Sequence, residues 1–267
     1  MKKIHFVKMQ NTKSISLTGN YCYLNCKHCN KHYLEHMATI NEIDNFSNMT
    51  SLLLSGGMNS EIKVPVYNFV ERLKEYKEKY GFKYNLHTGF MDKKELKKIK
   101  EISDAISFDL VGNAETMLEV YGVDKFEDMW DTFDNLINMK FNVKPHITIG
   151  LNGGKTTHEI EAIDRLSKYN VSDIVFLVFI PTPGSYFEDR EPPEIEEVIK
   201  IFEYAKEKIS GIKLTLGCMH PKGRYRRELQ EKLLYIADKI VQPVQNTIKI
   251  AQEENFEITW SYECCVF

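Results

Sequence analysis

The stretch Cys22–Tyr23–Leu24–Asn25–Cys26–Lys27–His28–Cys29 carries three cysteines on one short segment. It follows residues 14–17, whose apolar character predicts a strand, and a turn at residues 18–20. Cysteine thiolates are the usual ligands of 4Fe–4S clusters, so three of them on one loop predict such a cluster. Because no fourth cysteine stands at a similar spacing, one iron would stay open and could chelate a small molecule.

Two other uses of these cysteines follow from their residue type. A small zinc site would need a fourth Cys or His ligand, which His28 or His32 could supply. A disulfide framework is disfavoured, because the chain is long, has few cysteines for its length and shows no secretory signal pattern. The iron–sulfur and zinc interpretations both stay open at this point.

The bulk properties exclude several classes of protein. The chain has 267 residues and 43% apolar residues, which suffices to bury a sizeable core in one barrel-sized domain. Its net charge of −3 gives no electrostatic reason to expect a nucleic-acid partner, and no apolar run is long enough to span a membrane. We expect a cytoplasmic protein, in which clustered cysteines indicate metal binding or catalysis.

Predicted strands and helices alternate along the whole chain, without a linker. The predicted strands are residues 14–17, 51–54, 83–86, 105–109, 143–149, 173–180, 213–216 and 239–241. Helical periodicity fills most of the intervals between them, and an alternating segment at 257–262 follows the last helix. This pattern predicts one α/β domain over residues 1–267: a single parallel (β/α) barrel, TIM-like with eight strands and closed or nearly closed.

Unusual residues follow directly after the predicted strands. They are the cysteine loop, Gly56 and Gly57, His87, Asp109, residues 150–154, residues 181–184 and Cys218. In a parallel barrel these positions share the C-terminal face, which is where such barrels carry their active sites. The sequence therefore predicts one functional rim.

The order of these features resembles the radical S-adenosylmethionine (SAM) superfamily. That resemblance implies that Cys22, Cys26 and Cys29 ligate a 4Fe–4S cluster whose open iron chelates SAM. In that family, one electron cleaves SAM to a 5′-deoxyadenosyl radical, which abstracts hydrogen from an unactivated carbon.

The same resemblance implies contacts to SAM. His28 would lie near the adenine, and Ser55, Gly56 and Gly57 match the glycine motif whose backbone contacts the SAM amino group. Asp109 stands where a ribose or carboxylate contact is often found. Residues 150–154, beginning with Gly150, and residues 179–181, beginning with Phe179, would line the adenine side.

Each of these matches also has a simpler interpretation. The Gly56–Gly57 pair is a tight turn in many folds. Asp109 could cap the helix that follows its strand. Met58 stands where the family commonly has Glu, so no side-chain contact is expected there.

The remaining cysteines are Cys218, after the seventh strand, and the adjacent Cys264 and Cys265. Buried structural cysteine is one interpretation. Because adjacent cysteines near the end of the sequence fill a core poorly, we expect the tail at about 255–267 to fold over the barrel mouth. There the three thiolates would bind a second, auxiliary 4Fe–4S cluster. Candidates for its fourth ligand are Ser261, His220 and Arg224.

Residues 216–226, together with residues 18–26, 54–57 and the terminal Cys264–Cys265 pair, resemble biotin-synthase-related radical SAM proteins. The most similar family is that of the components of the two-protein lipoyl synthase. The resemblance implies sulfur insertion at C6 and C8 of an octanoyl chain, with sulfur drawn from the auxiliary cluster. Implied partners are an octanoylated lipoyl carrier domain, a paralogous radical SAM subunit, and a reductant such as ferredoxin or flavodoxin.

No acid, base or nucleophile can act on an aliphatic C–H bond in water, so a radical made from a cofactor suits such a substrate. A closed apolar barrel interior is expected to shield that radical from water. Single-chain lipoyl synthases differ by a second compact cysteine motif near the N-terminus, which this chain lacks.

Other functions stay open. One is a radical SAM enzyme whose auxiliary cluster anchors substrate or passes electrons, and another is a non-catalytic iron–sulfur or zinc protein. A sugar-phosphate barrel enzyme is disfavoured, since Cys218 interrupts the glycines where a phosphate loop would lie. The run Arg224, Arg226 and Arg227 is interpreted as a solvated helix face, or as a contact for a carrier domain or the SAM carboxylate.

Overall fold

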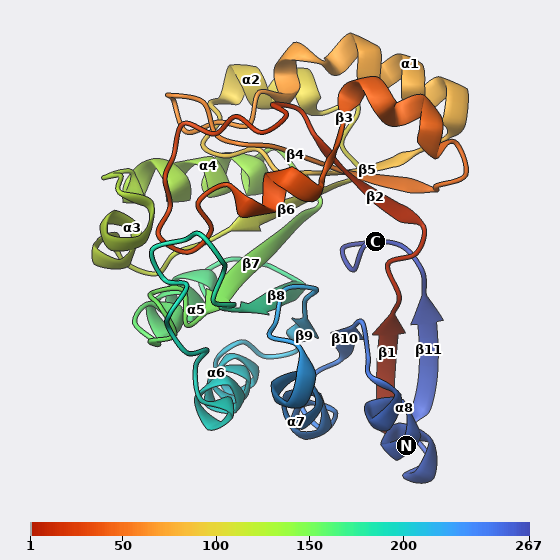
Figure 1. Ribbon diagram of the computed structural model, residues 1–267, viewed down its shortest axis with the longest axis vertical. Coiled ribbons are helices and arrows are strands. Elements are labelled where there is room, and N and C mark those ends of the chain that lie inside the picture. The colour runs from red at the N-terminus through yellow and green to blue at the C-terminus, as the bar shows by residue number, and fades with distance from the viewer. Residues whose placement is uncertain (1) are drawn as a thin grey trace.

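The computed structural model describes residues 2–267, and the strands of this part of the chain all join one curved sheet (Figure 1). All its hydrogen-bonded strand pairs are parallel. The strands are β1 (Lys3–Val7), β2 (Thr12–Ser16), β3 (Ala38–Thr39), β4 (Ser51–Ser55), β5 (Lys83–Leu86), β6 (Ala105–Asp109), β7 (Val143–Ile149), β8 (Asp173–Val178), β9 (Lys213–Leu216), β10 (Lys239–Val241) and β11 (Glu257–Ser261). Their order across the sheet is β11-β1-β10-β9-β8-β7-β6-β5-β4-β2-β3.

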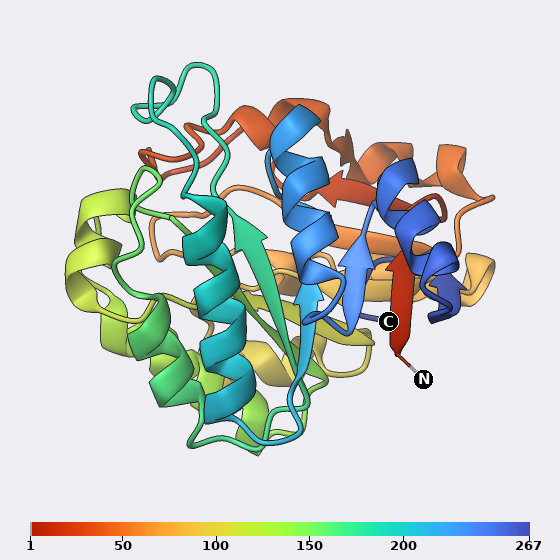
Figure 2. The ribbon, with the colours of Figure 1, turned by 90° about the horizontal axis from the view of Figure 1, so that it is seen from below.

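The helices cover the outer face of this sheet, and Figure 2 shows α6, α7 and α8 in front of the strands, running roughly along them. They are α1 (Val70–Tyr80), α2 (Lys93–Ile99), α3 (Ala114–Tyr121), α4 (Phe126–Asn138), α5 (Glu159–Leu166), α6 (Ile195–Lys208), α7 (Gly223–Leu233) and α8 (Gln245–Glu253), with short 3₁₀ turns at His32–His36, Ile40–Phe46 and Val66–Asn68. Contacts such as that between Phe176 of β8 and Phe202 of α6, with ring centroids 4.6 Å apart, form the core between the two layers. No helix within residues 2–267 has the length and apolar character needed to cross a bilayer.

The prediction of a closed eight-stranded barrel is wrong, because the sheet has eleven strands in this part of the chain and curls into a half-barrel. The N-terminal segment is the reason. Its first strand, β1, pairs with β10 and β11, whereas β2 pairs with β3 and β4 at the opposite end of the sheet order. The sequence pattern predicts no strand before residue 14 and leaves the segment of β11 outside the sheet.

The inner face of the sheet carries buried polar side chains beside apolar ones, which differs from the closed apolar interior that we expected. Side chains alternate along a strand, so Ala105, Ser107 and Asp109 of β6 share one face. Asn85 of β5 lies beside them and donates from Nδ2 to the Ser107 hydroxyl at 2.9 Å. The side chains of Asn85 and Ser107 are both buried in the interior.

The C-terminal tail lies inside the half-barrel, and the prediction that it folds over the mouth is not confirmed. The Glu263 carboxylate accepts hydrogen bonds from Thr50, just before β4, at 2.6 Å and from Lys83, the first residue of β5, at 2.8 Å. Lys239, which begins β10, donates to the Cys265 carbonyl at 2.6 Å. These bonds fix the tail to the starts of three strands, while its two cysteines pack in the same cluster as Cys218, which follows β9.

Candidate iron–sulfur sites

The first cysteine loop is fixed to the end of β4 by its backbone. Met58 N–H donates to the Cys22 Sγ at 3.3 Å, and Tyr23 N–H donates to the Met58 carbonyl at 2.7 Å. The Thr18 hydroxyl accepts from Gly57 N–H at 2.7 Å, so the glycine motif and the turn before Cys22 are held together.

The other side of the loop contacts two further segments. Lys27 N–H donates to the Val120 carbonyl at the end of α3 at 2.8 Å, and Phe187 N–H donates to the Lys27 carbonyl at 3.1 Å. Asn30 Nδ2 donates to the Gly184 carbonyl at 2.8 Å. The loop that follows β8 therefore covers the cysteine loop.

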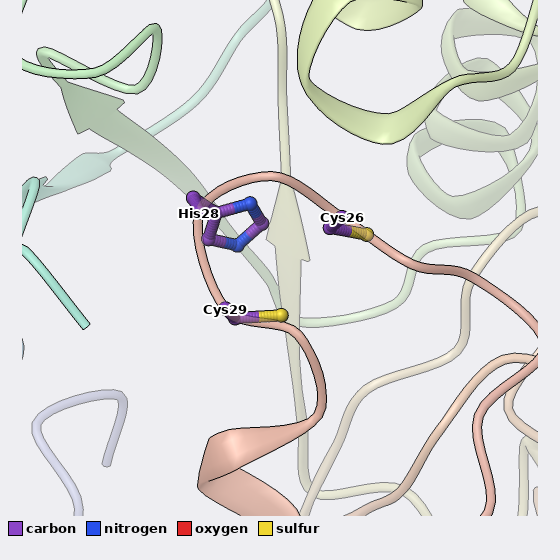
Figure 3. Close-up of side chains that lie close together, drawn as sticks. All are labelled: Cys26, His28 and Cys29. Atoms are coloured by element: carbon purple, nitrogen blue, oxygen red, sulfur yellow. The ribbon is translucent and has the colours of Figure 1, made fainter. Parts of the chain in front are cut away.

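Cys26, His28 and Cys29 bring their ligand atoms within 4.8 Å of one another (Figure 3). A hydrogen bond shared by Cys26 and Cys29 lowers the pKa of Cys29 to about 4 and raises that of Cys26, and burial raises both. Within residues 2–267, His28 Nδ1 is buried without a hydrogen-bonding partner. This donor set fits a bound metal or cluster, and it is compatible with both the zinc and the iron–sulfur interpretation.

Three of the predicted SAM contacts, Ser55, Gly150 and Phe179, follow or end strands of the sheet. The hydroxyl of Ser55, the last residue of β4, lies 3.2 Å from His87 Nδ1. Gly150 follows β7, and its N–H donates to the buried Glu159 carboxylate at 2.7 Å. Phe179 follows β8 and is buried against Phe187 in an edge-on contact.

Asp109 does not cap the next helix. It ends β6 with an exposed side chain, and α3 is instead capped by Asn113, whose side chain accepts from Thr116 N–H at 2.9 Å. Burial raises the pKa of Tyr121, and the charges of Asp109, Cys26 and Cys29 add to the effect. Asp109 therefore lies near enough to act on a residue next to the first cysteine set.

The second set of cysteines meets inside the half-barrel, away from the first. Cys218, Cys264 and Cys265 pack in one cluster with Val7, Ala105, Val175, Val241 and Val266. Asn85 Nδ2 donates to the Cys264 sulfur at 3.4 Å. In the described residues, neither set brings all three of its sulfurs within 4.8 Å of one another, because the group in the first loop consists of Cys26, His28 and Cys29 and leaves Cys22 out.

The thiols of the second set act on one another. A hydrogen bond from Cys265 lowers the pKa of Cys264 to about 7. Burial raises the pKa of Cys218 to about 12, and the charges of Cys264 and Asp109 contribute. The charge of Cys264 thus opposes ionisation of Cys218, and a bound cationic metal group would favour the thiolates.

The three residues considered as a fourth ligand are otherwise engaged. The His220 ring is fully buried, with Nδ1 2.9 Å from the Gly217 carbonyl and Nε2 3.1 Å from Gln230 Nε2. The Arg224 side chain is 84% exposed and pairs with Glu228. Ser261 bonds to His5 Nε2 at 2.9 Å.

Several residues around the second set were missed by sequence reasoning. Asn85, Ser107 and Lys239 belong to strands, and their polarity at alternate positions was the available signal. Without the register, that signal does not say which face of a strand points inward.

No protein-family model matches this chain, and no curated protein does. Solved structures with the same fold include two radical SAM enzymes. Methylornithine synthase (PylB) matches with a TM-score of 0.65 and 13% identity, over 96% of this chain and 84% of that one. The FeFe-hydrogenase maturase HydG from Carboxydothermus hydrogenoformans matches with a TM-score of 0.72 and 14% identity, over 99% of this chain and 69% of that one.

The same arrangement occurs outside that superfamily. An HMG-CoA lyase from Acenitobacter baumannii matches with a TM-score of 0.54 and 12% identity, over 95% of this chain and 87% of that one. At such identities these likenesses establish the fold: a parallel α/β half-barrel of the kind that radical SAM enzymes use. The particular chemistry must be argued from the cysteines.

Proposed function

We propose that this chain is a radical SAM enzyme that inserts sulfur into an unactivated C–H bond of a protein-bound octanoyl chain. Its assignment as a lipoyl synthase component rests on the motif resemblance. The observation that supports sulfur insertion in particular is the meeting of Cys218 with Cys264 and Cys265 inside the half-barrel. Cys218 is distant in sequence from Cys264 and Cys265, and only folding brings the three together. Such a separate set of cysteines suits a second cluster that donates sulfur.

In this proposal each cysteine set holds one 4Fe–4S cluster. Cys22, Cys26 and Cys29 hold the cluster that binds SAM and, when bound, supplies the electron for SAM cleavage. Ser55, Gly57 and the residues from Gly150 onward border the place where SAM would lie. Asp109 is near both sets, because its charge affects the pKa of Tyr121 beside the first and of Cys218 in the second. The substrate carbon would be bound between them.

The test begins with anaerobic reconstitution of the full chain and of a Cys264→Ala/Cys265→Ala variant. We expect about eight irons per chain in the wild type and about four in the variant, as two cubane clusters and one require. The wild type, given SAM, a reductant and an octanoylated lipoyl domain, should release 5′-deoxyadenosine and add sulfur to the domain, as mass spectrometry would detect. The variant should form 5′-deoxyadenosine without adding sulfur.

A paralogous radical SAM subunit belongs in the assay, because a two-protein system can divide the two insertions between its members. If the wild type binds about four irons, the proposed sulfur donor is absent and the proposal fails. If it binds zinc and no iron, the chain is a zinc protein.

Polar groups in the interior favour a second candidate function, a radical SAM enzyme with a non-sacrificial auxiliary cluster. Burial lowers the pKa of both His87 and His146, and the charge of Asp109 opposes this in each case. Such groups suit a polar substrate better than a bare hydrocarbon chain. A radical SAM enzyme with a non-sacrificial auxiliary cluster would cleave SAM and modify its substrate while the sulfide content of the protein stays constant over turnovers.

A further inference from the structure

Arg226 differs from its neighbours because part of its guanidinium is buried. Within residues 2–267, its Nε is one of the few buried side-chain polar atoms without a hydrogen-bonding partner. Its Nη2 donates to the His220 carbonyl at 3.2 Å, which keeps the guanidinium over the segment that follows β9. A buried donor without a partner is costly, so its retention calls for a partner that the protein chain itself does not supply.

The neighbouring arginines behave as a solvated helix face, as the sequence suggests. Arg224 is largely exposed and bonded to Glu228, and Arg227 is exposed. Arg226 departs from this pattern. Burial lowers the pKa of Arg226, and the charge of Cys218 opposes that effect, so the guanidinium lies within electrostatic reach of this thiol.

A second cation lies at the other end of the same cysteine set. Lys239 Nζ donates to the Cys265 carbonyl at 2.6 Å. Burial lowers the pKa of Lys239, and the charges of Cys265 and Asp173 oppose this effect without outweighing it. Of the two cations, Arg226 is the one with a buried nitrogen that has no hydrogen-bonding partner in the described residues.

We propose that Arg226 is a positioning residue of the second cysteine site, whose guanidinium supplies the positive charge and hydrogen bond that hold an anionic iron–sulfur group there and raise its reduction potential. This inference rests on the proposed function, because it needs a cluster on Cys218, Cys264 and Cys265. Potentials of such clusters depend on net charge and on hydrogen bonds to the sulfurs. Arginine suits this role since it keeps its charge when desolvated and presents several donors.

The experiment isolates the second site in a Cys22→Ala/Cys26→Ala/Cys29→Ala background of the full chain, reconstituted without oxygen. Arg226→Gln and Arg226→Lys are compared in that background, with Arg227→Gln as the matched control on the exposed face. Iron and sulfide are measured per chain, and the cluster is titrated by EPR at fixed potentials. Circular dichroism confirms that each variant is folded.

We expect about four irons in the background. In Arg226→Gln, the ratio of reduced to oxidised cluster at a given potential should be about tenfold lower than in the background. This corresponds to a shift of the reduction potential of about −59 mV for one electron. Arg226→Lys should recover most of the shift, and Arg227→Gln should match the background. If Arg226→Gln loses its iron but Arg226→Lys keeps it, charge is again the cause and the proposal holds.

Two outcomes overturn the inference alone. One is a potential unchanged by Arg226→Gln. The other is loss of iron in both Arg226 variants, which would indicate that arginine ligates the metal. A background without iron overturns both the inference and the proposed function. A shifted potential in a protein that never adds sulfur to the octanoyl domain overturns only the proposed function.

Discussion

At the scale of single residues, Gly57 decides how closely the end of β4 can approach the first cysteine loop. A Cβ at this position would lie 2.0 Å from the Tyr21 carbonyl oxygen and 2.5 Å from the Cys22 Cα. Both neighbours are backbone atoms, which cannot move aside as a flexible side chain could. The close approach of the cysteine loop therefore requires a glycine at position 57 on steric grounds alone.

Gly57→Ala should displace Cys22 and remove most of the iron at the first site. The second site should keep about four irons, because the substitution is confined to the first loop. Gly19→Asn, in the turn before Cys22, is the matched control, since a Cβ there would meet no atom within 4 Å and its φ of +58° is one that asparagine tolerates. Iron counts that are equal in the two variants would contradict the steric argument.

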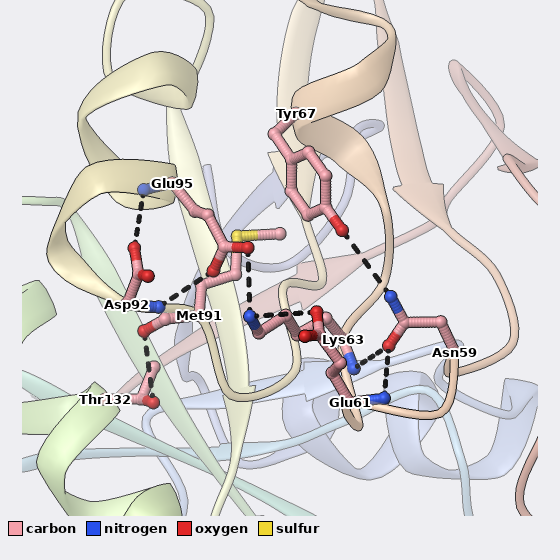
Figure 4. A network of polar contacts seen from close by, with 8 residues as sticks. All are labelled: Asn59, Glu61, Lys63, Tyr67, Met91, Asp92, Glu95 and Thr132. Atoms are coloured by element: carbon pink, nitrogen blue, oxygen red, sulfur yellow. Dashed lines mark hydrogen bonds and ion pairs between the residues drawn. The ribbon is translucent and has the colours of Figure 1, made fainter.

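At the scale of secondary-structure elements, α2 begins with a capping box at Asp92. The Asp92 carboxylate accepts from Glu95 N–H at 2.8 Å, and Asp92 N–H donates to the Glu95 carboxylate at 3.0 Å (Figure 4). Lys63 also pairs with Glu95 at 2.9 Å. The cap thus joins α2 to the loop that follows the glycine motif, a contact that the sequence could not predict.

Asp92→Ala should lower the free energy of unfolding by about 0.5–2 kcal/mol, since it removes the side-chain acceptor at the helix N-terminus. Urea denaturation of the reduced apo protein would measure this. Lys94→Ala, at an exposed position in the first turn, should leave the midpoint nearly unchanged. A loss of the same size in both variants would mean that the cap contributes nothing specific.

Asp173, at the start of β8, should make part of the stability depend on pH. Burial raises its pKa, but hydrogen bonds from Lys144 and Ser172 outweigh this and lower the pKa overall. A lowered folded pKa means that the contribution is complete above the ordinary value of about 3.9 and is lost as pH falls through the folded value. The stability of Asp173→Asn should fall less steeply than that of the wild type below about pH 4. Asp131→Asn, at an exposed site, should follow the wild type.

At the scale of the whole molecule, local patterns predicted elements better than their assembly. The predictions of 105–109 and 143–149 as strands are confirmed by β6 and β7. The barrel closure was wrong because β1 is recognised only by its partners β10 and β11, which lie at the other end of the chain. The approach of Cys218 to Cys264 fits the grouping that the sequence suggested.

The position of the tail could not be predicted for the same physical reason. Nothing local in residues 262–267 shows where they lie; that depends on β11 running parallel to β1 and on the bonds from Glu263 to Thr50 and Lys83. Once placed, the tail buries Cys264, Cys265 and Val266 against the inner face of the sheet. It therefore packs as a plug inside the half-barrel, in addition to supplying thiols.

These two roles can be separated by comparing a deletion of residues 264–267 with Cys264→Ala/Cys265→Ala. Both remove the thiols, but only the deletion removes Val266, whose burial alone contributes about 1.5–3 kcal/mol. In the reduced apo protein, the deletion should unfold at lower urea and speed hydrogen exchange in β5 and β10, where the plug contacts the strands. The double alanine variant should change exchange much less. Equal exchange in the two variants would show that the tail serves only to present its cysteines, and that the inner face is closed by other contacts.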